Sequence, residues 1–266
     1  MKIIDFHAHA FPRKVATKAI DRLEIHYNIE IENVGTLEHL VTTASQADIH
    51  RSVLHASATN ARQVEAVNNW IADVTSPRII RFGTIHPEYE DIEKELIRLK
   101  SLGIKGLKLH PDFQQFDLTD QKMYELYEKI GDQFLVLFHV GDDVYPTEDN
   151  YSTPQKMAQV IKDFPQLNAV AGHLGGYRMW DEAEKNIIGH DIYLDTSSVF
   201  RYISLERASE LIKAHGTDKV LFGSDYPMEV PAKEIKNVLN LDLSLTDKWK
   251  ILYKNGFELL SRFDLL

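Results

Sequence analysis

The chain has 266 residues, of which 44% are hydrophobic and 26% charged, a balance typical of a globular protein with a sizeable core. Its formal net charge of -10, with lysine and arginine scattered along the chain, argues against nucleic acid and anionic membranes as partners. The chain has no cysteine, so disulfides and thiolate ligands are excluded, and any metal ion must bind to nitrogen and oxygen atoms.

The sequence also bears on the compartment. The longest strongly apolar run, FLVLFHV at 134–140, is far too short to span a bilayer. The first residues enter a strand without the basic and apolar regions of a signal peptide. We therefore expect a soluble, cytoplasmic protein, and the sequence leaves open whether it forms a homo-oligomer.

Short runs rich in β-forming residues alternate with helix-like segments along the whole chain. The predicted strands are 2–7, 51–56, 78–85, 104–110, 134–140, 167–173, 191–197 and 219–225. The predicted helices are 61–74, 90–103, 120–132, 154–164 and 204–216, and two more are expected between the first two strands.

This alternation predicts the α/β class with a parallel sheet, and at this length a closed (β/α)8 TIM barrel fits best. An open, doubly wound sheet is the alternative, but no glycine-rich phosphate loop follows the first strand. No linker or change of composition interrupts the chain, so we expect a single domain over 1–266.

Histidines gather where the predicted strands end, which is the end of such a barrel where active sites lie. His7 and His9 close the first strand, and strict alternation puts both on the face opposite Ile4 and Phe6. The other strand-end residues of this kind are His55, His86, His110, His139, His173 and Asp225. The remaining histidines are expected to be ordinary helix or loop residues: His26, His39, His50, His190 and His215.

The same alternation tests which side chains face inward. Lys108 and His110 share one face of the fourth strand, and Gly223 shares a face with Asp225, where a small residue suits a crowded interior. Imidazoles with one carboxylate suit Zn²⁺, and also Mn²⁺ or Fe²⁺. Asp225 could accept a proton from a metal-activated water, and His173 could hydrogen-bond that water or an oxyanion.

The motifs resemble the amidohydrolase superfamily: the HxH of His7 and His9, then His139, AGHLGG with His173, and LFGSDYP with Asp225. GLKLHP, IYLDTSS and the closing ILYKNGFELL are similar to the amidohydrolase-2 branch. That branch includes aminocarboxymuconate-semialdehyde decarboxylase and related lactone hydrolases, and the resemblance covers nearly the whole chain.

The resemblance implies one divalent metal ion, with Zn²⁺ as the first expectation. Its implied ligands are His7, His9, His139 and Asp225, and His173 would position the water. Lys108 stands about where binuclear members of the superfamily carry a carboxylated lysine, and we expect it to be unmodified.

Loops after the strands carry further candidates for binding a small-molecule substrate. The candidates are Lys108, His110, Arg178 and Tyr226. Arg178 and Arg201 could fork onto a substrate carboxylate. An aromatic pocket wall could be built from Tyr145, Tyr177, Trp180, Phe200 and Tyr226.

These features predict a metal-dependent hydrolase that opens a lactone, amide or ester of a small carboxylated molecule through a metal-activated water. The alternative is a metal-dependent, non-oxidative decarboxylase of an aromatic or dienoic acid, because the same ligands serve either reaction. A TatD-like nuclease shares the barrel and the HxH, but its polyanionic substrate conflicts with the net charge of -10. A non-catalytic zinc site would close with local ligands, not with ligands from distant strands.

Overall fold

The computed structural model describes residues 2–143 and 150–266, and its centre is an eight-stranded parallel sheet in chain order. The strands are β1 (Ile4–His9), β2 (Arg51–His55), β3 (Ile79–Thr84), β4 (Gly106–Leu109), β5 (Leu135–Phe138), β6 (Asn168–Ala171), β7 (Tyr193–Asp195) and β8 (Val220–Leu221). The sheet closes on itself, since Phe6 N–H donates to the Phe222 carbonyl (2.7 Å) and Asp225 N–H to the His7 carbonyl (2.8 Å). The predicted TIM barrel is therefore confirmed.

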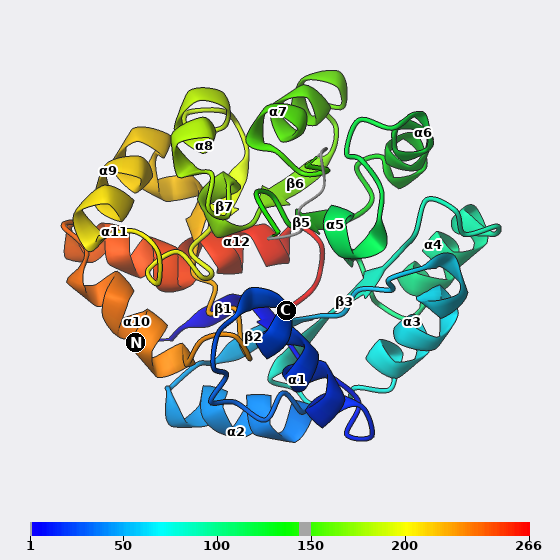
Figure 1. Cartoon of the computed structure of the whole chain (residues 1–266), viewed down its shortest axis with the longest axis horizontal. Helices are drawn as coiled ribbons and strands as arrows, with labels where there is room; N and C mark the ends of the chain where they lie inside the picture. The colour runs from blue at the N-terminus through cyan, green and yellow to red at the C-terminus, as the bar shows by residue number, and fades with distance from the viewer. Residues whose placement is uncertain (1, 144–149) are drawn as a thin grey trace.

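Helices form a ring outside the strands (Figure 1). They are α1 (Ala16–Tyr27), α2 (Leu37–Gln46), α3 (Val64–Ala72), α4 (Ile92–Ser101), α5 (Pro111–Gln114), α6 (Gln121–Ile130), α7 (Pro154–Asp163), α8 (Trp180–Asn186), α9 (Leu205–His215), α10 (Pro231–Asn240), α11 (Leu245–Trp249) and α12 (Asn255–Ser261). Each of the five helices predicted by residue range is present, as are the two between β1 and β2. None of the helices in the described part of the chain is long and apolar enough to cross a membrane.

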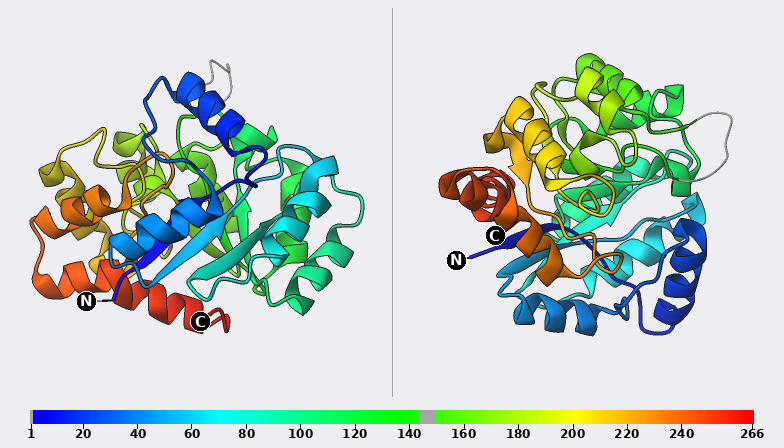
Figure 2. Two further views of the ribbon diagram at one scale, coloured as in Figure 1. Left: turned by 90° about the horizontal axis from the view of Figure 1, so that it is seen from below. Right: turned by 60° about the vertical axis from the view of Figure 1, so that its left-hand side comes forward.

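Apolar side chains fill one end of the barrel interior. They come from alternate positions of the strands, from α12 and from the turn after it: Ile4, Phe6, Val53, Ile80, Phe82, Leu135, Leu137, Val170, Leu221, Leu259, Leu260 and Phe263. Figure 2 shows α12 and α1 at opposite ends of the barrel. Helix α12 closes the end where the strands begin, and the other end, where the strands finish, lies beside α1.

The first strand departs from strict alternation. Its pairing with β2 shifts register between Asp5 and Ala8, which marks a β-bulge or similar irregularity. Phe6 packs inside the barrel against Phe82, with ring centres 6.0 Å apart, and His7 also faces inward against Gly223. The expectation that these two neighbours point to opposite faces is therefore wrong, because the irregularity resets the alternation between them.

In β4, the side chains face the directions that the alternation predicts. Leu107 and Leu109 of β4 pack outward in the core between sheet and helices, and Lys108 between them points into the barrel. A Cβ atom on Gly223 would lie 2.8 Å from the Cβ of His7, so this position has room only for glycine.

The Gly223→Ala variant tests this crowding. We expect the free energy of unfolding in urea to fall by about 1–3 kcal/mol, because the added methyl group forces His7 or the segment after β8 to move. Gly256→Ala in α12 is the matched control, since its nearest contact would be at 3.5 Å and alanine favours a helix. Equal stability of the two variants would contradict the crowding.

Candidate active site

A cavity of about 840 Å³ opens at the end of the barrel where the strands end. Its base is lined by side chains from β1, β2 and β4 and from the segments that follow β5, β6 and β8. Those at the base include His7, His9, Lys108, His139, His173 and Asp225. The structure therefore brings the main predicted site residues to one cavity.

His7 is oriented by a carboxylate. Its Nδ1 lies 2.9 Å from Asp195 Oδ2, and both side chains are fully buried. Because a carboxylate only accepts, Nδ1–H donates to Asp195 and leaves the lone pair on Nε2. That lone pair faces the Nε2 atom of His9, 3.1 Å away.

His7, His9 and Asp225 form a compact group of donor atoms. Asp225 Oδ1 lies 3.7 Å from His7 Nε2 and 3.6 Å from His9 Nε2. Two ligands of a tetrahedral metal ion, each about 2.0–2.2 Å from it, are roughly 3.3–3.6 Å apart. The three separations, 3.1, 3.6 and 3.7 Å, lie within about 0.2 Å of this range, so the group fits a divalent cation.

Burial sets the charge of these groups. It lowers the pKa of His7 and of His9 well below the usual value, so both imidazoles are neutral and can donate a lone pair. It raises the pKa of Asp225, whose Oδ2 accepts a hydrogen bond from the Ser198 hydroxyl. Lys108 is also fully buried, with Nζ 3.2 Å from His7 Nε2, and burial lowers its pKa to about 8.

His139 and His173 form a second pair in the cavity. His139 Nδ1 lies 3.0 Å from His173 Nε2, and His173 Nδ1 donates to the Ser197 carbonyl at 2.9 Å. His139 does not join the group of His7, His9 and Asp225. Its donor atom lies within 4.8 Å of those of His110 and Asp143, and the rings of His110 and His139 stack with centres 4.1 Å apart.

Arg178 and Tyr226 are not among the residues that line the cavity. Arg178 is exposed, with its guanidinium 6.0 Å from the ring centre of Tyr202. Tyr226 is buried with its hydroxyl 2.8 Å from His39 Nδ1, so it points away from the site. Arg201 pairs with Glu229 instead of facing the cavity.

The expected aromatic wall is present in part. Tyr177 lines the cavity, but Trp180 and Phe200 do not, and the Trp180 indole N–H donates to the His173 carbonyl at 2.9 Å. Tyr145 lies outside the described residues. Of the other strand-end histidines, His55 lines the cavity and His86 bonds the Gln114 carbonyl at 3.0 Å.

Sequence reasoning missed several residues around the site. Asp195 ends β7 at the same level as the strand-end histidines, so its place in the strand could have marked it. Tyr27 and His26 at the end of α1 line the cavity, and both contact the buried Asp143. No local pattern marks this contact, because it joins residues more than a hundred positions apart.

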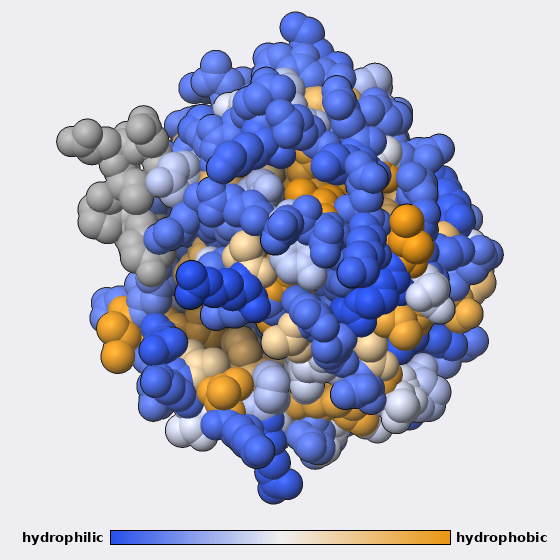
Figure 3. Space-filling view, turned by 90° about the vertical axis from the view of Figure 1, so that its right-hand side faces the viewer, coloured by the Kyte–Doolittle hydropathy of each residue, from blue (hydrophilic) through white to orange (hydrophobic). Residues whose placement is uncertain are grey.

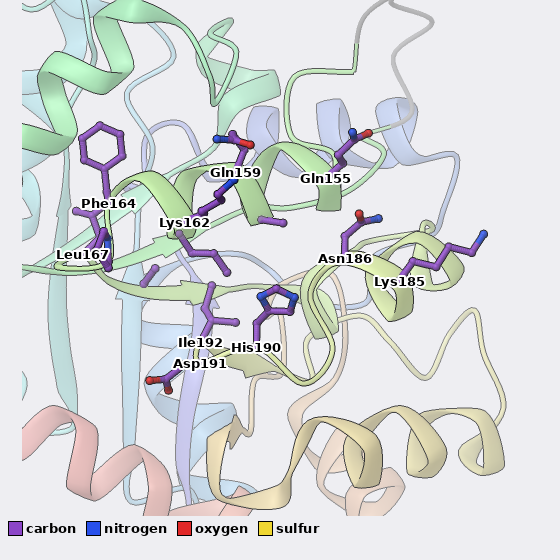
Figure 4. A pocket seen from close by; sticks show the side chains of 14 residues that line it. Gln155, Gln159, Lys162, Phe164, Leu167, Lys185, Asn186, His190, Asp191 and Ile192 are labelled. Carbon is purple, nitrogen blue, oxygen red and sulfur yellow. The ribbon is translucent and has the colours of Figure 1, made fainter.

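Figure 4 shows a second cavity, of about 590 Å³, beside α7 and α8. It brings together Lys162, Lys185, His190 and Asp191. The two groups of metal-ligating side chains found in the described part of the chain both lie elsewhere. The cavity at the strand ends is therefore the candidate active site.

Comparison with solved structures shows the same fold in other proteins. An uncharacterized TIM-barrel protein from Bordetella bronchiseptica is 22% identical, with a TM-score of 0.75 over 99% of this chain and 100% of that chain. 5-Carboxyvanillate decarboxylase from Sphingomonas paucimobilis is 14% identical, with a TM-score of 0.71 over 100% of this chain and 99% of that chain.

A dihydroxybenzoic acid decarboxylase from Polaromonas sp. JS666, solved with manganese and 2-nitroresorcinol, is 17% identical. Its TM-score is 0.70 over 100% of this chain and 99% of that chain. No curated protein matches the sequence. The family model described as amidohydrolase matches residues 4–262. Because this match spans nearly the whole chain, the protein belongs to the amidohydrolase-2 family of the amidohydrolase superfamily.

Proposed function

We propose that the protein is a metal-dependent enzyme that decarboxylates an aromatic acid without oxidation. The observation that carries the proposal is the His7, His9 and Asp225 group at the base of a cavity with apolar and aromatic walls. Aromatic acid decarboxylases among the similar folds support this reading better than the hydrolase expected first from the sequence.

His7 Nε2, His9 Nε2 and Asp225 Oδ1 would hold one divalent ion, and His139 remains a proposed fourth ligand. When bound, the ion would act as a Lewis acid that polarises a substrate oxygen or lowers the pKa of a water molecule. Nitrogen and oxygen donors suit Zn²⁺, Mn²⁺ and Fe²⁺. The manganese in the Polaromonas decarboxylase supports Mn²⁺ beside the Zn²⁺ expected from the sequence.

Decarboxylation breaks the bond between the ring and the carboxyl group, and the electron pair left on the ring carbon takes up a proton. Asp225 lines the base of the cavity beside the other proposed ligands, and we propose it as the group through which that proton passes. Lys108 would bind a substrate oxygen from inside the barrel. His173, fixed by the Ser197 carbonyl through Nδ1 and paired with His139 through Nε2, would contact the substrate with the face of its ring.

Hydrolysis is the second candidate. The description of the matching family as amidohydrolase is consistent with it, and Asp225 in its ionised form could accept a proton from an attacking water molecule. Incubation with hydroxybenzoates in D₂O, and separately with lactones, separates the two reactions. Release of CO₂ with one deuterium at the vacated ring carbon supports decarboxylation, and ring-opened acid without CO₂ would assign hydrolysis.

His7→Ala and His9→Ala test the metal group. We expect purified protein to hold about one divalent ion per chain, and each variant to lose the ion and the activity while it keeps a cooperative unfolding transition. Elemental analysis and urea denaturation measure the two properties. His190→Ala, an exposed histidine, is the control. Unchanged metal content in both site variants would refute the ligand assignment.

Asp195→Asn tests how His7 is oriented. An amide can donate to Nδ1 and thereby move the ring proton to Nε2, where it blocks the lone pair. We expect metal affinity to fall by about 10–100-fold, measured by competition with a chelator. Asp264→Asn, an exposed carboxylate paired with Lys105, should bind metal normally. Wild-type affinity in Asp195→Asn would show that Asp195 does not orient His7.

Asp225→Asn tests proton transfer. Asparagine keeps one coordinating oxygen but cannot exchange a proton, so we expect kcat to fall by at least about a thousandfold, or roughly 4 kcal/mol, with the metal largely retained. Turnover is compared at equal metal content. Near-normal turnover in the metal-loaded variant would remove Asp225 from the chemistry of either reaction.

A further inference from the structure

Helices α1 and α3 present facing apolar surfaces to the outer part of the cavity. Val15, just before α1, lines it with Ala19 and Leu23, which follow at intervals of four residues on one helix face. On α3, Val67 and Trp70 line it from the other side at an interval of three. Figures 1 and 2 show α1 lying across the end of the barrel where the strands end.

These apolar side chains are only partly covered by the rest of the described chain, although Val67 and Trp70 also pack against the core. Val15 is 47% exposed, and Leu23, Val67 and Trp70 are only half-buried. The space-filling view from the side shows a hollow of orange and tan residues at its lower left (Figure 3). Apolar surface that stays open beside a binding site is typical of a surface that a ligand covers.

The cavity is therefore divided by polarity. Its ionisable groups lie mainly at the base, on the strand ends, and the stretch between α1 and α3 carries Arg22 among mostly apolar side chains. The volume of about 840 Å³ is in the upper part of the usual range for ligand sites, so a single-ring acid would fill only the base.

We propose that the substrate is an amphipathic acid whose apolar extension, an alkyl or aryl substituent remote from the carboxylate, lies between α1 and α3. The extension contacts Leu23 and Trp70, which select substrates by its length. The position of the carboxylate at the base of the cavity rests on the proposed function. The position of the apolar extension rests only on the residues that line the cavity between α1 and α3.

Binding of 4-alkylbenzoates to the purified holoenzyme tests the proposal, with benzoate and its 4-ethyl, 4-butyl and 4-hexyl derivatives compared by calorimetry. We expect the dissociation constant to fall about fourfold for each added methylene group that becomes buried. Trp70→Ala and Leu23→Ser should flatten this dependence and leave benzoate binding unchanged. Trp249→Ala, in α11 and outside the cavity, should keep the wild-type dependence.

The two variants are independent, because Leu23 lies on α1 and Trp70 on α3. If one of them fails to fold, the other still measures how binding depends on tail length. A dissociation constant that does not depend on tail length, or the same dependence in both variants as in the wild type, overturns the inference. If the dissociation constant depends on tail length but the enzyme releases no CO₂ from any benzoate, only the proposed decarboxylation is contradicted. CO₂ release without any length dependence contradicts the extension alone.

Discussion

The buried hydrogen bond between His7 and Asp195 joins the first strand of the barrel to the seventh. Asp195 also accepts hydrogen bonds from the backbone N–H groups of His173 and Ser197, so both of its oxygens are satisfied without water. Leaving a buried carboxylate unpaired would cost about 3–5 kcal/mol, so this arrangement constrains β1, β7 and the turn after β6 together. The lone pair of His7 is thereby aimed at His9 and Asp225.

The need to pair buried polar groups also divides the barrel interior into an apolar end and a polar end. Apolar side chains fill the end closed by α12, and the ionisable side chains that line the cavity lie at the other end. There, burial keeps the imidazoles neutral and raises the pKa of Asp225. A divalent cation bound to these groups would favour ionised Asp225 and offset much of the free energy that its burial costs.

Features that follow from strand periodicity can be predicted from the sequence. Features that depend on contacts between distant residues cannot. Lys108 and Asp225 face the cavity as predicted, because parallel strands alternate their side chains and end at one level. Tyr226 does not, because Asp225 has a φ of +59° and the chain turns there. The partnership of His7 with Asp195, 188 residues away, leaves no local pattern to read.

Closure of the barrel also concerns how the protein folds. The Ser224 hydroxyl donates to Asp5 across 219 residues of sequence, and His7, His9 and Asp225 meet only where this first and last part of the chain pair. Pairings between such distant segments form slowly, because the entropy of a long loop is lost before the contacts compensate it. A ligand that needs all three residues binds the closed barrel and no partly folded chain. Its concentration would therefore set the fraction of chains that are folded, by mass action.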